Sequence, residues 1–192
     1  MAEPVRKPAG YEDVLRAPEH TIAQVIDGEL HTQPRPGAAH QNAASTLGGE
    51  LVPRFGRGRG GPGGWIILDE PELHLGVSIL VPDLAGWRRE RLPAIEDVPY
   101  FTLAPDWVCE ILSPATARLD RVRKLPLYAE AHVRHAWIID PSARSLEVFR
   151  LEGERWSLLS THSETDLVRA EPFDAFELEL GLLWADVIVR ST

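Results

Sequence analysis

The sequence contains a single cysteine, Cys109, among its 192 residues. One cysteine excludes an internal disulfide and any metal site built from several cysteines. No apolar run approaches the roughly 20 residues that a membrane-spanning helix requires. The N-terminal segment, MAEPVRKPAG, also lacks the apolar stretch of a secretory signal. We therefore expect a protein without a membrane span, and the cytoplasm is its default location.

Positive charge is scarce as well. The chain has 20 lysine and arginine residues against 29 aspartate and glutamate residues, which gives a formal net charge of −9. This balance argues against a protein that coats nucleic acid through bulk charge, but it is compatible with an enzyme that has acidic metal ligands and a local basic rim. Lys7 and Lys124 are the only lysines, so a lysine inside the folded region is a candidate for a specific role.

The residues that are present indicate one globular domain over residues 1–192. Hydrophobic residues make up 44% of the chain and charged residues 26%, which is enough apolar material for a core. The patterns predict helices at 11–16, 38–52 and 119–132, a hairpin around Asp27-Gly28, two or three strands in 65–87, single strands at 107–112, 135–140, 145–151 and 154–160, and a short strand and terminal helix in 171–189. This order favours an α/β or α+β fold in which helices pack against a sheet.

Residues 53–64, PRFGRGRGGPGG, are too rich in glycine to form a regular element. We interpret them as a flexible loop in preference to a segment that contacts nucleic acid, although Arg54, Arg57 and Arg59 could reach phosphates. The segment does not match a phosphate-binding loop, because no Gly-Lys-Ser/Thr sequence follows it.

The stretch DWVCEILSP, residues 106–114, predicts a buried strand with one carboxylate, Glu110, at its centre. Alternate side chains of a strand share a face, so Glu110 lies with Val108 and Leu112, on the side opposite Cys109. An unpaired charge in such a position costs several kcal/mol or must be neutralised. The position favours a functional carboxylate over a structural partner of an arginine.

A second carboxylate, Asp83, follows Pro82 at the end of another apolar stretch, ILVPDL. If the two strands pair, Asp83 and Glu110 lie within reach of one ion, which would remove the repulsion between them. Oxygen ligands without a nearby cysteine or histidine favour Mg²⁺, with Mn²⁺ as the next candidate. Taken alone, Asp83 is better explained as an ordinary strand end.

The helix that follows the Glu110 strand carries Lys124. Arg121, Lys124 and Tyr128 are spaced three and four residues apart, which places them on one helix face. A helix that packs back over the sheet would bring Lys124 near the two carboxylates. The alternatives are a solvated surface lysine and a helix kinked by Pro126.

Several of these segments together resemble the Uma-type family of putative restriction endonucleases. They are PDL at 82–84, CEILSPAT at 109–116, the helix with Lys124 and Tyr128, HAWIIDP at 135–141, IDGEL at 26–30 and His40-Gln41. The resemblance covers residues 10–185. It implies the PD-(D/E)XK nuclease superfamily, whose restriction-endonuclease-like fold is a mixed β-sheet flanked by helices and whose members are thought to cut nucleic acid with Mg²⁺.

The resemblance also implies roles for individual residues. Asp83 is similar to the motif aspartate, Glu110 to the motif acid, and Glu29 to an additional N-terminal acid. The lysine of the superfamily would fall at Leu112, so the resemblance places that role on Lys124 in the next helix.

The expected activity is that of a metal-dependent endonuclease. Asp83, Glu110 and the backbone carbonyl of Ile111 are the expected metal ligands. Lys124 is expected to position the attacking water or balance charge, and Glu29 to bind a second ion or orient a ligand. Contacts to nucleic acid, DNA in preference to RNA, are expected from Arg118, Arg121, Arg123 and His40. Each arginine is equally compatible with a solvated surface. The position of His40 favours an ordinary helix N-terminal or core histidine over a catalytic one.

Two other functions remain open at this point. One is a nuclease-fold protein that binds nucleic acid or dimerises without cutting, which the acidic charge and the displaced lysine favour. The other is a metal-dependent hydrolase of a small phosphoester, which a closed pocket would favour. A homodimer, formed through strand ends or the VFRL hairpin, is expected because cleavage of two strands would use two sites.

Overall fold

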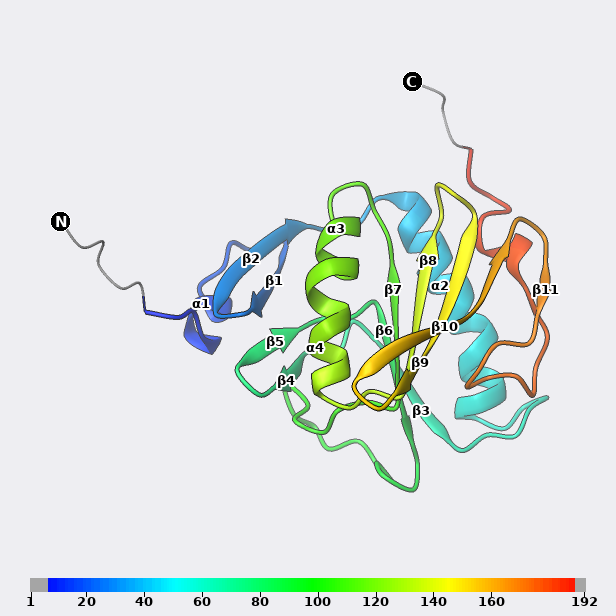
Figure 1. The fold of residues 1–192 in the computed structure, drawn as a ribbon, viewed down its shortest axis with the longest axis horizontal. Coiled ribbons are helices and arrows are strands. Elements are labelled where there is room, and N and C mark those ends of the chain that lie inside the picture. Colours follow the sequence, from blue (N-terminus) through cyan, green and yellow to red (C-terminus); the bar gives the residue numbers. More distant parts are fainter. Residues whose placement is uncertain (1–6, 189–192) are drawn as a thin grey trace.

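The computed structural model describes residues 7–188, and its centre is a six-stranded sheet (Figure 1). In spatial order the strands are β10 (Arg155–Ser163), β9 (Ser145–Glu152), β8 (His135–Asp140), β7 (Trp107–Ile111), β6 (Leu84–Arg88) and β3 (Trp65–Asp69). β7 and β8 pair in parallel and all other neighbours pair antiparallel, which makes the sheet mixed. The predicted mixed sheet is confirmed.

A second sheet has four strands and contains the predicted hairpin. Its order is β2 (Glu29–Pro34), β1 (Thr21–Ile26), β5 (Ser78–Leu80) and β4 (Leu73–Leu75), and a short helix, α1 (Tyr11–Leu15), precedes it. Asp27 and Gly28 form the hairpin turn with φ of 52° and 76°, values that glycine and aspartate tolerate well. The segment 65–88 forms four strands where two or three are predicted, because the chain reverses at Gly76 between β4 and β5.

Helices cover both faces of the six-stranded sheet (Figure 1). On one face lies α2 (Ala38–Leu51), which continues as the π-helical turn η1 (Val52–Gly56). The other face is covered by one continuous helical segment made of α3 (Ala117–Leu119), the π-helical turn η2 (Asp120–Lys124) and α4 (Leu125–Glu130). Two apolar cores result, one between the sheet and α2 and one between the sheet and α4.

The π-helical turn η2 lies next to Pro126. The N–H of Leu125 bonds to the carbonyl of Asp120, five residues earlier. A proline inside a helix has no N–H to donate and crowds the carbonyl four residues before it. The wider π turn relieves this conflict, so the helix continues through the proline as α4.

The C-terminal segment closes the α2 side of the molecule. β11 (Leu167–Val168) pairs with β12 (Leu178–Glu179), and the 3-10 turn η3 (Leu180–Leu183) follows. Asn42 of α2 donates a hydrogen bond of 3.0 Å to the carbonyl of Leu183. Within the described residues, which end at 188, the predicted terminal helix is wrong. Burial of this segment against α2 takes precedence over its helical periodicity. None of the helices between residues 7 and 188 combines the length and apolarity that crossing a bilayer requires.

Candidate active site

Glu110 lies in the middle of β7 and has 2% of its surface exposed. Val108 and Leu112, on the same side of the strand, belong to the apolar core beneath α4. Both faces of β7 are covered by helices, which explains why the strand reads as a nearly continuous apolar run. The same burial removes the carboxylate from water, so its neighbours must compensate the charge.

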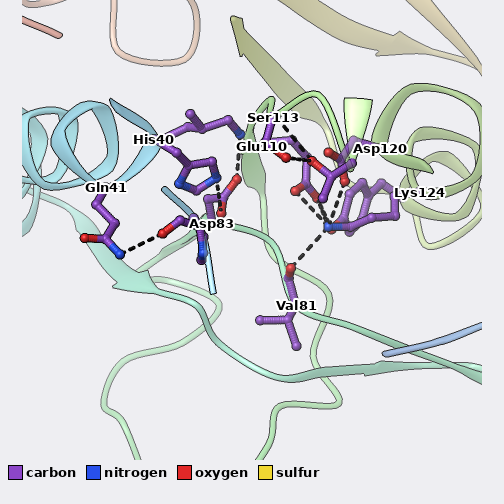
Figure 2. Close-up of polar contacts among 12 residues, drawn as sticks. His40, Gln41, Val81, Asp83, Glu110, Ser113, Asp120 and Lys124 are labelled. Atoms are coloured by element: carbon purple, nitrogen blue, oxygen red, sulfur yellow. Dashed lines mark hydrogen bonds and ion pairs between the residues drawn. The ribbon is translucent and has the colours of Figure 1, made fainter. Parts of the chain in front are cut away.

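Asp83 directly precedes β6, in the bend that links β5 to β6. β6 and β7 pair antiparallel, with Leu84 opposite Cys109. Asp83, the residue before Leu84, therefore lies across from Glu110, the residue after Cys109. Asp83 Oδ2 accepts the N–H of Ile111 at 2.6 Å. Asp83, Glu110 and Ile111 all line one cavity of about 240 Å³. Figure 2 shows Asp83 and Glu110 from neighbouring strands. The two carboxylates therefore face a common space.

Lys124 reaches Glu110 from the helical segment above the sheet (Figure 2). Its Nζ lies 2.7 Å from each oxygen of the Glu110 carboxylate and donates to the carbonyl of Val81 at 3.1 Å. Only 1% of Lys124 is exposed, so it is not a solvated surface lysine. The parallel pairing of β7 and β8 requires a crossover connection, and this crossover carries the helix back over β7.

Two further residues of this segment join the site, and neither is predicted as a site residue from the sequence. Tyr128 Oη donates to Glu110 Oε1 at 2.5 Å, and Asp120 Oδ1 lies 3.4 Å from Lys124 Nζ. Both are buried. Asp120, Lys124 and Tyr128 follow one another at intervals of four, and this spacing is the signal that could have identified them together.

Arg121, which is predicted to share the helix face of Lys124, instead pairs with Glu147 of β9. A π turn is wider than an α turn, so residues four apart align better within η2 than residues three apart. Asp120 therefore takes the place beside Lys124 that the α-helical spacing assigns to Arg121. The correction changes the charge of the site, because an acid lies where a base is expected.

Carboxyl groups outnumber the ammonium group around the cavity. Burial raises the pKa of Glu110 to about 8; Lys124 opposes this rise, whereas Asp120 and Asp83 add to it. Burial lowers the pKa of Lys124, but its attraction to the three carboxylates outweighs that effect and the pKa is raised overall. The ammonium thus stays charged, and a bound cation would favour the ionised form of Glu110 in the same way.

His40 holds Asp83 from the other side of the cavity (Figure 2). It lies in the first turn of α2, and its Nε2 is 3.0 Å from Asp83 Oδ1. With Ile111 on Oδ2, both oxygens of Asp83 have a partner, which restricts the orientation of this carboxylate. His40 is therefore placed to orient Asp83, in addition to lining the cavity.

Glu29 does not reach the cavity, contrary to the role that the resemblance implies. Its side chain is 68% exposed and lies 3.6 Å from Arg123 and 3.7 Å from His31. Glu29 starts β2 at the hairpin turn, whereas the cavity is lined by the opposite end of the strand, Gln33 and Pro34. The length of β2 thus separates Glu29 from the carboxylates.

Arg118 and Arg123 also lie outside the cavity. Arg118 is exposed on α3, and Arg123 donates through Nε to Asp27 Oδ2 at 2.8 Å. Their predicted contacts to nucleic acid, if made, belong to the surface around the site.

The donors in the cavity fit a hard divalent cation. Asp83 and Glu110 supply carboxylate oxygens, and Ile111 lines the cavity beside them. Mg²⁺ is commonly held by one or two carboxylates while it keeps several waters. Across residues 7–188 no group of three or more histidine, cysteine, aspartate or glutamate side chains gathers closely enough to form a metal cage. The fit is therefore to a two-carboxylate site in which Glu110 also keeps its bonds to Lys124 and Tyr128.

Comparisons with known proteins identify the family and the fold. Residues 10–182 match the Uma2 family, described as "Putative restriction endonuclease". Among solved structures the chain is similar to a putative nuclease belonging to DUF820 from Anabaena variabilis, with a TM-score of 0.73 and 23% identity over 93% of this chain and 98% of that one. At this identity the similarity demonstrates the fold. No curated protein matches the chain. Because the family match spans most of the sequence, the resemblance is confirmed and the chain belongs to the Uma2 family of putative restriction endonucleases.

Proposed function

We propose that the protein is a metal-dependent endonuclease that hydrolyses phosphodiester bonds of nucleic acid, DNA in preference to RNA. The observation that carries the proposal is the meeting of Asp83, Glu110 and Lys124 at one cavity. Membership of a family described as putative restriction endonucleases supports the same class of reaction. The proposed cofactor is Mg²⁺ or Mn²⁺, held by Asp83, Glu110 and the carbonyl of Ile111, and the proposed location is the cytoplasm.

A bound cation would supply Lewis acidity at the phosphate and lower the pKa of a water molecule. The residues of the chain do the positioning. His40 and the N–H of Ile111 hold Asp83, while Tyr128 holds Glu110. Groups that are already oriented do not have to reorganise during the reaction, and this is the main way in which a protein stabilises developing charge.

Lys124 is the one cationic group among these contacts. Its ammonium has three protons and bonds Glu110 and Val81 in the structure. In the proposed reaction it orients the attacking water and offsets negative charge on the phosphate. Water then attacks phosphorus and the bond from phosphorus to the leaving sugar oxygen breaks.

The test uses supercoiled plasmid, single-stranded DNA and single-stranded RNA with Mg²⁺, with Mn²⁺ or with a chelator. We expect cleavage with either metal, faster for DNA, and none with the chelator. Asp83→Ala and Glu110→Ala should each abolish it. Asp106→Asn is the matched control, because Asp106 is 3% exposed but pairs with Arg91 away from the cavity. Undiminished cleavage in both alanine variants would contradict the assignment.

One alternative is hydrolysis of a small phosphoester. The cavity of about 240 Å³ is too small for a stretch of duplex and lies below the roughly 300–1,000 Å³ of typical small-molecule sites, so the substrate of such an enzyme would be a small one. Hydrolysis of p-nitrophenyl phosphate without action on any nucleic acid would favour this function. Binding of DNA without cleavage in either metal would instead indicate a non-cutting binding module.

We infer further that the protein acts as a homodimer, since cleavage of both strands of a duplex uses two sites. The outer strands of the six-stranded sheet, β3 and β10, each have one unpaired edge within the described residues, and β10 is nine residues long. Light scattering should give twice the 21.4 kDa mass of the chain. A mass of one chain at assay concentration would contradict the dimer.

A further inference from the structure

Gln24 is a buried polar side chain to which the proposed reaction assigns no role. It lies on β1 with 1% of its surface exposed. Its Oε1 accepts the N–H of Val81 at 2.8 Å. The amide cannot be turned around, because Nε2 would then face another N–H group. Gln24 therefore anchors Val81 through its oxygen.

The nitrogen of the same amide gains nothing from this arrangement. Gln24 Nε2 is buried and has no hydrogen-bond partner among residues 7–188. A buried donor without a partner reduces stability, and an apolar side chain of similar size would avoid that cost. What Gln24 contributes to the molecule is thus the bond from its oxygen to Val81.

Val81 connects Gln24 to the candidate active site. Its carbonyl accepts the bond from Lys124 Nζ at 3.1 Å (Figure 2). Val81 lies between β5 and β6, outside both strands. The next residue, Pro82, has no N–H and so cannot hold this connecting segment in place by a hydrogen bond. Asp83 comes next, so the bond from Gln24 steadies the segment that carries both the acceptor of Lys124 and the first carboxylate.

We propose that Gln24 is a positioning residue of this site. By holding Val81, it sets the carbonyl that directs Lys124 Nζ toward Glu110. The proposal rests on the proposed function for the role of Lys124, but the contact chain from Gln24 through Val81 to Lys124 can be tested without any activity.

The first test reads the ammonium of Lys124 directly. Lys7 and Lys124 are the only lysines, and Lys7 is exposed, so labelling with ¹⁵N at the lysine side chain gives one buried signal and one reference. Gln24→Met removes the acceptor and keeps the volume. We expect it to shift the Lys124 signal and to speed exchange of its protons about tenfold, with Lys7 unchanged.

Trp87→Phe is the control for a purely structural effect. It removes an equally buried hydrogen bond, from Trp87 Nε1 to the carbonyl of Leu103 at 2.9 Å, outside the contact chain. This variant should leave the Lys124 signal in place. An unchanged signal in Gln24→Met, or an equal change in Trp87→Phe, would overturn the proposal. If Gln24→Met does not fold, Gln24→Asn, which keeps the amide but is too short to reach Val81, replaces it.

Turnover supplies the second test. Gln24→Met should lower kcat about tenfold and leave KM for DNA unchanged, because a positioned group is disturbed and no substrate contact is lost. In a Lys124→Met background the same substitution should cause no further loss, whereas independent effects would add. Additive losses would overturn the link through Lys124. Absence of cleavage by the unaltered protein would contradict the proposed function instead, and the lysine signal would still decide the role of Gln24.

Discussion

The two faces of β7 have opposite characters although their residues alternate along one short strand. Toward α2, Trp107, Cys109 and Ile111 pack into an apolar core. Toward α4, Glu110 interrupts the apolar surface and bonds Lys124. Packing on the α2 side is purely apolar, whereas the α4 side combines apolar packing with the buried ion pair of Glu110 and Lys124. Substitutions on the two faces should consequently affect different measurements.

The largest effect is expected from Glu110→Gln, which removes the charge and keeps the shape. Loss of a proposed metal ligand should lower cleavage on the order of 10³-fold. Because the pKa of Glu110 is raised to about 8, the ionised carboxylate costs stability in the folded protein. The variant also places an amide N–H beside the Lys124 ammonium, which lies 2.7 Å from each oxygen of Glu110, so the two effects on stability oppose each other. Calorimetry should show a cooperative unfolding transition, which would separate the loss of cleavage from a loss of folding, and undiminished cleavage by the folded variant would contradict the role of Glu110.

On the opposite face, Leu47→Ala should act on stability alone. Leu47 of α2 is fully buried in the apolar core, so the cavity left behind should cost about 3 kcal/mol of unfolding free energy in a urea titration. The folded variant should retain its kcat. Leu158→Ala, at a half-exposed leucine of β10, is the control and should cost less than about 0.5 kcal/mol. A loss of kcat comparable to that of Glu110→Gln would remove the distinction between the faces.

A smaller effect concerns pH and metal. The pKa of Glu110 is raised from 4.5 to about 8, so the folded state retains a proton that the unfolded state releases. The contribution of Glu110 to stability should therefore fall as pH rises through this range. Mg²⁺ should raise the thermal midpoint more at about pH 9 than at about pH 6, where it must displace the proton. Glu110→Gln should abolish this difference, and an equal shift at both pH values would contradict a role of Glu110 in binding the ion.

The smallest effect is expected at Cys109, on the apolar face. Burial raises the pKa of its thiol well above the ordinary value, and Asp83 and Glu110 raise it further. Iodoacetamide should therefore leave the native protein unmodified and label it fully in urea. Cys109→Ala should change kcat little and cost about 1 kcal/mol of stability. Rapid labelling of the native protein would show that the core beneath α2 opens.

The elements that the sequence predicts well are those whose conformation is set by residues adjacent in the chain. The turn at Asp27-Gly28 needs two residues that tolerate positive φ, and both are adjacent in the chain. The strand at 107–112 and the helix at 38–52 follow from local apolar patterns and are present as β7 and α2. β4 and β5 are three residues each and depend on partners elsewhere in the second sheet, so a local pattern does not delimit them.

The site divides in the same way. Alternation places Glu110 on the correct face of its strand, and the following helix brings Lys124 to it. Asp120 escapes prediction because a π turn changes which helix positions coincide. The position of Glu29 outside the cavity could not be predicted, because an acid next to a turn carries no information about which end of the hairpin faces the cavity.

Local chemistry therefore dictated which residues are candidates: one acid inside an apolar strand, a second beside a proline, and a lone lysine in the next helix. Which of them share a cavity was decided by packing. Pairing of β6 with β7 brings Asp83 beside Glu110, and the crossover to β8 places Lys124 on Glu110. These contacts join segments that are distant in the chain, and their free energy comes from burying whole faces against each other, which no short stretch of residues encodes.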